Sequence, residues 1–191
     1  MLAMTEETGA ETQLREPSMT AGEAEVVLFA LERSRAVFAW KCGGLDAAGL
    51  NKQHPPSELT LAKLLKHIAL IEDNYTAVYL SGQPMNEPWR SVDFDHEAGW
   101  DGWEWRTAAD DSPEELYALW NSAVKRSRDA MAKVLADGGL DQPSKFTSSS
   151  GESPNIRRVL ADLNEEYARH VGHADLLREA VDGLVGEAQP R

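Results

Sequence analysis

Residues 153–183, SPNIRRVLADLNEEYARHVGHADLLREAVDG, are the most regular stretch of the chain. An apolar residue returns every three or four positions, which is the period of an α-helix with one buried face. Ser153 and Pro154 are typical of a helix start, and Gly183 is typical of a helix end. The buried stripe consists of Ile156, Val159, Leu160, Leu163, Tyr167, Ala174, Leu177 and Val181. The stretch predicts one long helix that packs against other helices.

Three more stretches share this period, each bounded by residues typical of helix ends: residues 20–42, 60–80 and 112–137. Thr20 and Glu23 have the spacing of an N-terminal capping box, and so do Ser112 and Glu115. No stretch shows a convincing strand pattern. Four long amphipathic helices predict an all-α fold, a four-helix bundle.

The connections between these helices differ in length. The short ones predict that the first and second helices are antiparallel, and likewise the third and fourth. Residues 83–111 form a long connection that holds four of the six tryptophans. We expect it to pack on the bundle and to cross its length, which leaves the second and third helices parallel. Residues 1–19 are expected to be a disordered tail, residues 20–186 the bundle, and residues 187–191 a C-terminal tail.

The composition excludes several classes of protein. The chain has 19 Lys and Arg against 32 Asp and Glu, which gives a net charge of −13. Nucleic acid and anionic membrane surfaces attract clustered basic residues, so neither is expected as a partner. Cys42 is the only cysteine, which rules out an intrachain disulfide. With no apolar leader and no stretch of about 20 apolar residues, we expect a cytoplasmic protein.

Polar side chains interrupt the apolar faces of two helices. Glu166 and His170 are four residues apart, so they project from the same side of the last helix. His67 lies at the edge of the apolar face of the second helix. Two imidazoles and one carboxylate can hold Zn, Ni, Fe or Mn with coordination positions left open. The alternative is that these are hydrogen-bonded core residues without a metal.

Two segments carry a resemblance to a known family. Residues 165–179, EEYARHVGHADLLRE, resemble the last-helix signature of the DinB/YfiT-like superfamily. Residues 60–72, TLAKLLKHIALIE, resemble its second-helix signature. The resemblance extends over about residues 21–187 and is strongest to the actinobacterial branch called mini-circle proteins or domains of unknown function. It implies a DinB-like four-helix bundle with a long crossover between the second and third helices.

The resemblance also implies a divalent metal, most often zinc or nickel, held by His67, Glu166 and His170. Many relatives have a histidine where this chain has Glu166. The related mycothiol-dependent maleylpyruvate isomerase branch also has a glutamate there, so the exchange is compatible with a metal site. His173 is the alternative third ligand in place of Glu166, because it also lies within one turn of His170.

Further residues are candidates for a supporting role around this site. Glu72 could hold a ligand imidazole in one tautomer, with a salt bridge as the alternative. Tyr75 and Trp40 could line a pocket, although aromatic residues at helical spacing are more often ordinary core. His173 is a neighbour of the site if it is not a ligand. No general base can be named from the sequence.

Two functions fit these features. The first is a metal-dependent transferase or isomerase that uses a low-molecular-weight thiol, mycothiol or bacillithiol, as cosubstrate; the superfamily suggests this chemistry. The second is a non-catalytic stress-response or interaction module with a structural or vestigial metal. We expect a homodimer in both cases. The sequence does not identify the electrophilic substrate, the thiol or the metal.

Overall fold

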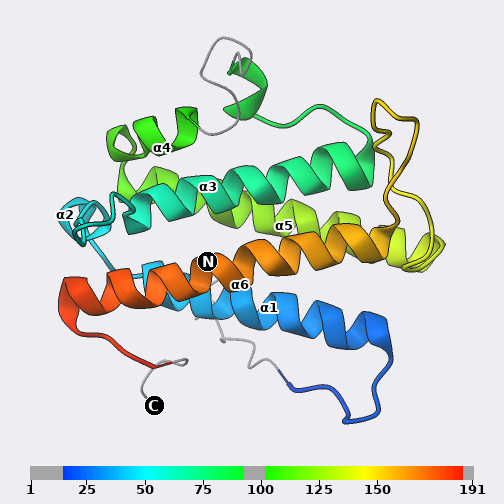
Figure 1. Cartoon of the computed structure of the whole chain (residues 1–191), viewed down its shortest axis with the longest axis horizontal. Helices are drawn as coiled ribbons and strands as arrows, with labels where there is room; N and C mark the ends of the chain where they lie inside the picture. The colour runs from blue at the N-terminus through cyan, green and yellow to red at the C-terminus, as the bar shows by residue number, and fades with distance from the viewer. Residues whose placement is uncertain (1–14, 93–101, 187–191) are drawn as a thin grey trace, which may run out of the picture.

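The computed structural model describes residues 15–92 and 102–186, which form six α-helices and no strand (Figure 1). Four helices are long: α1 (Glu23–Cys42), α3 (Leu61–Asn74), α5 (Pro113–Asp137) and α6 (Ile156–Asp182). Two are short: α2 (Ala47–Leu50) and α4 (Trp103–Thr107). The prediction of an all-α fold is confirmed. None of the described helices combines the length and apolar character needed to cross a membrane.

The long helices pack side by side in two pairs, α1 with α6 and α3 with α5, and α6 also contacts α3 (Figure 1). The colours of Figure 1 show that α3 and α5 run in the same direction and that α1 and α6 run in the opposite one. The long connection between α3 and α5 makes this possible, as expected from its length. The arrangement brings α3 and α6, the two helices with the candidate metal ligands, into direct contact.

The second long helix continues beyond α3 as a π-helix, η1 (Tyr75–Ser81). It ends at Gly82, whose φ of 64° lies in the left-handed region that glycine adopts without strain. The predicted bounds of this helix are therefore confirmed, but the wider π turn of its last seven residues was not predicted.

Helix starts follow the predicted caps in one case and not in another. Both hydrogen bonds of the predicted capping box at Ser112 and Glu115 are present. The prediction of Thr20 as a cap is wrong: α1 begins at Glu23 after Gly22, without a side-chain cap. The Thr20 hydroxyl lies instead 3.2 Å from that of Ser18. This local hydrogen bond competes with capping of the helix.

The last helix also begins slightly later than predicted. Asn155 is its N-cap and accepts a hydrogen bond from the backbone N–H of Arg158. Of the two predicted tails, residues 1–14 and 187–191 lie outside the described residues.

The long connection packs on the bundle, as its tryptophans predict. It contains two short 3-10 helices, η2 (Trp89–Ser91) and η3 (Ala108–Asp110), with α4 just before η3. Trp89 is 1% exposed, and its ring packs edge-on against that of Trp103 at 5.8 Å between centroids. Residues 93–101 of this connection lie outside the described residues.

A buried lysine of α3 fixes the α4 segment in place. The Lys66 ammonium donates a hydrogen bond to the Thr107 hydroxyl at 2.8 Å and pairs with Asp111 at 2.6 Å. It also lies 4.4 Å from the centroid of the Trp103 ring, a cation–π contact. These contacts hold α4 against α3, beside His67.

Candidate metal centre

The apolar face of α3 determines where His67 lies. Thr60 caps the helix by accepting a hydrogen bond from the N–H of Lys63. Leu64 and Ile68, on either side of His67 in sequence, are fully buried. His67 lies at the edge of that face, and its side chain is 15% exposed. The helix therefore carries the imidazole at the boundary between core and solvent.

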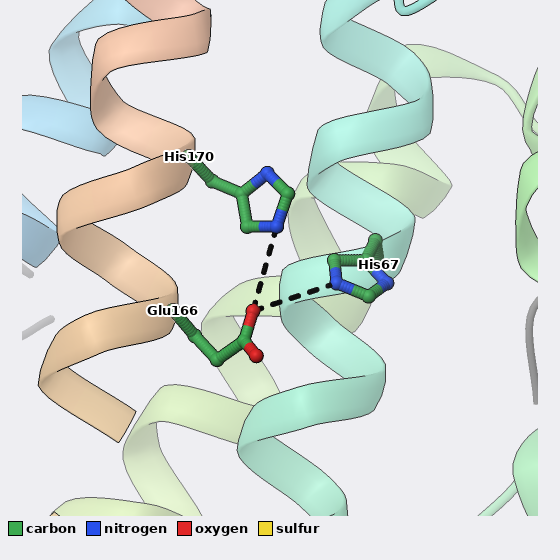
Figure 2. Close-up of side chains that lie close together, drawn as sticks. All are labelled: His67, Glu166 and His170. Carbon is green, nitrogen blue, oxygen red and sulfur yellow. Dashed lines mark ion pairs between the residues drawn. The ribbon is translucent and has the colours of Figure 1, made fainter. Parts of the chain in front are cut away.

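The last helix α6 places Glu166 and His170 in the same way. Leu163, Tyr167 and Ala174 are buried and fix the rotation of the helix. Glu166 and His170 are one turn apart, on the side of α6 that faces α3 (Figure 2). The His170 side chain is 9% exposed and that of Glu166 is 30% exposed.

The three side chains converge on one point between α3 and α6 (Figure 2). Glu166 Oε2 lies 3.5 Å from His170 Nε2 and 3.9 Å from His67 Nε2. One ligand atom from each residue lies within 4.8 Å of the others. Donor atoms around a tetrahedral zinc ion at bond lengths near 2.0–2.1 Å are about 3.3 Å apart. The separations of 3.5 and 3.9 Å are close to this spacing, so the three residues are candidates for holding a divalent cation.

Glu104 of α4 contacts the opposite side of the His67 ring. Its Oε1 lies 3.2 Å from His67 Nδ1, while His67 Nε2 faces Glu166. The Trp105 ring stacks on His67, with 4.3 Å between centroids and 22° between planes. Carboxylates commonly fix metal-ligating histidines in this way. Sequence reasoning missed Glu104, because the connection contains many acids and no periodicity singles out this one.

The charges of the cluster shift two pKa values in opposite directions. Hydrogen bonds from His170 and then from His67 hold the pKa of Glu166 well below its ordinary value. Burial disfavours a charged His67, but its contacts with Glu104 and Glu166 outweigh burial and raise its pKa. A cation at the centre would replace the proton of His67 as the charge that balances Glu166.

His173 lies behind His170. The Nδ1 atoms of the two rings are 3.3 Å apart, while His170 Nε2 faces Glu166. Burial and then the nearby charges of His170 and Arg169 lower the pKa of His173. The cluster of convergent ligand atoms contains Glu166 and does not include His173. The geometry therefore favours Glu166 as the third ligand and His173 as a neighbour.

Glu72 takes the second of the two roles that the sequence left open, a salt bridge. Its carboxylate is fully buried and accepts hydrogen bonds from Arg35, at 2.7 and 2.8 Å, and from the Tyr167 hydroxyl at 2.7 Å. It therefore joins α1, α3 and α6 through a salt bridge, the alternative that the sequence left open. The carboxylate that contacts the imidazole of the candidate ligand His67 is Glu104 instead.

The two aromatic candidates lie apart from one another. Tyr75 is half-buried at the start of η1, with its ring 5.1 Å from that of Tyr79. Burial, then the charge of Asp162 and to a smaller extent that of Glu166, raises its pKa to about 12. The contacts of Trp40 are at the end of α1, where the Lys41 ammonium lies 4.4 Å from its ring centroid. Tyr75 thus lies close enough to the cluster to feel the charge of Glu166, whereas the ring of Trp40 lies at the end of α1, close to Gly186.

Comparisons with known proteins agree with this fold and identify a family. A family model of mycothiol-S-transferases matches residues 26–183. A solved structure, the crystal structure of the mycothiol-dependent maleylpyruvate isomerase, is similar with a TM-score of 0.51 and 15% identity. The match covers 76% of this chain but 59% of the isomerase chain, so it shows a shared fold. No curated protein sequence matches the chain.

Proposed function

The chain belongs to the mycothiol-S-transferase family, within the DinB-like superfamily, and from this premise we propose that it is a metal-dependent thiol transferase. The thiol is mycothiol, and the metal is a divalent cation, zinc or nickel, held by His67, Glu166 and His170. The observation that carries the proposal is the convergence of these three ligand atoms between α3 and α6.

The number and exposure of the ligands favour a catalytic rather than a structural metal. Structural zinc sites are usually closed by four protein ligands, whereas catalytic sites have three and leave a position for water or substrate. Here two imidazoles and one carboxylate converge, and solvent reaches Glu166 and His67. A thiol can therefore approach from the exposed side of the cluster.

The chain's own thiol is unsuited to the reaction. Cys42, the only cysteine of the sequence, is fully buried, and burial raises the pKa of its thiol. A buried neutral thiol is a poor nucleophile. The reactive sulfur must come from a cosubstrate, which agrees with a thiol-dependent transferase.

The ligand residues have separable roles in such a reaction. A bound divalent cation supplies Lewis acidity, which favours the thiolate form of a thiol at neutral pH. His67 and His170 offer neutral nitrogen atoms, and Glu166 supplies one negative charge. Glu104 holds the far nitrogen of His67, so that the ring keeps its orientation while substrates exchange.

A transfer assay tests this function. We expect the metal-loaded protein to accelerate the addition of mycothiol to a chromogenic electrophile, such as a chlorinated nitroaromatic. His170→Ala should lose this activity. His54→Ala is the matched control, because His54 is exposed in the connection before α3 and is not one of the convergent ligand residues.

Two outcomes would count against the proposal. No acceleration by metal-loaded wild type with mycothiol, across several classes of electrophile, would favour the non-catalytic module. Full activity in His170→Ala would show that the reaction does not depend on the proposed centre.

A further inference from the structure

We propose that Glu104 is a positioning residue that selects the tautomer of His67 in which Nδ1 carries the proton and Nε2 is free to bind the metal. The inference rests on the proposed function, because it concerns the same metal centre. It assigns a role to the α4 segment, which contributes no ligand of its own to the cluster.

The burial of Glu104 requires an explanation. Its side chain is 1% exposed, and its Oε1 contacts His67 Nδ1 at 3.2 Å. Its Oε2 is buried and has no hydrogen-bond partner in the described part of the chain. Removing a carboxylate from water without full compensation is costly. Burial of the Glu104 carboxylate costs free energy, and its hydrogen-bond contact is with the imidazole of His67. We therefore assign Glu104 a role at the metal centre and not only in the stability of α4.

The two nitrogens of His67 face different elements. Nδ1 faces Glu104 on α4, and Nε2 faces Glu166 on α6. A neutral imidazole has one N–H and one lone pair, and an acceptor at one nitrogen draws the proton there. Both nitrogens face a carboxylate, but Glu104 Oε1 lies 3.2 Å from Nδ1, within hydrogen-bond distance, whereas Glu166 Oε2 lies 3.9 Å from Nε2. The nearer carboxylate favours the proton on Nδ1 and leaves the lone pair on Nε2, the atom that faces Glu166.

Docking of α4 does not depend on Glu104 alone. The neighbouring residue Lys66 holds the same segment. Lys66 and His67 are consecutive on α3, and the ammonium of Lys66 contacts Thr107, Asp111 and the Trp103 ring. Lys66→Met thus weakens the docking of α4 and leaves the contact between Glu104 and His67 chemically intact.

Metal affinity in four proteins tests the inference. We would titrate Co²⁺ into metal-free wild type, Glu104→Gln, Glu104→Leu and Lys66→Met, and follow the visible absorption of the bound ion. Loss of such an outer hydrogen bond typically weakens metal binding by about 10- to 100-fold. We expect Glu104→Leu to fall in this range, Glu104→Gln to lie between it and wild type, and Lys66→Met to stay within about threefold of wild type.

The tautomer itself supplies a readout that a purely structural role would not change. In the metal-free proteins above the pKa of His67, the ¹⁵N shifts of its ring should report the proton on Nδ1 in wild type and in Lys66→Met. In Glu104→Leu they should report a mixture or the Nε2–H form. If Glu104→Leu does not fold, the same spectrum of Glu104→Gln, which is nearly isosteric, decides the question.

The results separate this inference from the proposed function. Equal metal affinity in wild type and Glu104→Leu, or an unchanged tautomer, would overturn the role of Glu104. Equal losses in Lys66→Met and Glu104→Leu would also overturn it, because they would trace the effect to docking of α4. Wild type that binds no metal would instead overturn the proposed function, and the ring shifts would still test the tautomer.

Discussion

The ring of His67 is contacted on three sides. Glu104 holds one nitrogen, Glu166 faces the other, and Trp105 covers one face of the ring. A ligand held on three sides loses little freedom when a metal binds. Glu104 and Trp105 come from α4 and Glu166 from α6, so the environment exists only in the folded chain.

The shifted pKa values predict how stability of the metal-free protein depends on pH. The pKa of His67 is raised, so its stabilising effect is complete below its ordinary value of 6.5 and is lost as the pH rises through the raised value. The pKa of Glu166 is lowered, so its effect is complete above its ordinary value of 4.5 and is lost on acidification. We expect the cluster to stabilise the metal-free fold most between these two values.

Urea unfolding at several pH values, with and without Glu166→Gln, measures this effect. The difference in free energy of unfolding between the two proteins should be largest near pH 5–6 and should shrink towards pH 8. A difference that instead grows above pH 7 would contradict the assigned direction of the His67 shift.

Metal affinity should follow the opposite course, because a proton and a metal ion compete for His67. Below the raised pKa of His67, affinity should fall about tenfold for each pH unit. Above that pKa it should level off. Titrations with Zn²⁺ between pH 5.5 and 8 check this, and an affinity independent of pH would exclude His67 as a ligand.

At the level of the elements, a buried ion pair joins the long helices. Arg35 of α1 contacts Glu72 of α3 and the Ser127 hydroxyl of α5, and Tyr167 of α6 donates to Glu72. Because Tyr167 directly follows Glu166, this network also fixes α6 next to the candidate metal centre. Arg35 has a second carboxylate partner, Glu32, whose side chain is 24% exposed.

The two carboxylates of Arg35 should differ in their effect on stability. Glu72→Gln leaves a buried guanidinium without its main counter-charge, which costs about 3–5 kcal/mol in comparable cases. Glu32→Gln is the matched control, and we expect about 1 kcal/mol or less because its pair is partly solvated. Chemical denaturation of both variants measures the difference. Equal losses in the free energy of unfolding would show that the buried pair stabilises the protein no more than the partly solvated pair does.

Most elements were predictable because their local signals agree with the fold. The apolar period identified all four long helices, and the capping box at Ser112 located the start of α5 within a residue. Thr20 failed because a local hydrogen bond with Ser18 competes with the cap. The π turn of η1 was not predictable, since the same residues have an ordinary helical period.

The candidate site was predictable only in part, for a similar reason. His67, Glu166 and His170 interrupt regular apolar faces, so periodicity exposes them, and the structure brings them together. Glu104 lies in a connection without a period, and its contact with His67 depends on how α4 packs on α3. Glu72 interrupts an apolar face just as the candidate ligands do, so the sequence left two roles open, and the structure shows the salt bridge with Arg35.

On the scale of the whole molecule, the candidate centre joins two helices that are far apart in sequence. His67 lies on α3, while Glu166 and His170 lie on α6, after the long connection and α5 (Figure 1). The expected homodimer remains a prediction, which light scattering can check.

A ligand that binds only the folded state stabilises it by mass action, by about 2.7 kcal/mol at a free concentration of 100 times Kd. Metal addition should therefore raise the melting temperature. For a chain of this length, a gain of that size corresponds to about 5–10 °C. We expect this shift for wild type with Zn²⁺ or Ni²⁺ and none for His170→Ala, as measured by differential scanning calorimetry. An equal shift in both proteins would indicate binding elsewhere on this acidic chain.

The central claim, a metal centre made by His67, Glu166 and His170, is tested most directly by metal content. We would purify wild type, His67→Ala, His170→Ala and the control His54→Ala without chelator or histidine tag and count metal by mass spectrometry. The account predicts about one equivalent of zinc or nickel in wild type and His54→Ala, and little in the two ligand variants. No metal in wild type, even after divalent ions are added, or full occupancy in both ligand variants, would contradict it.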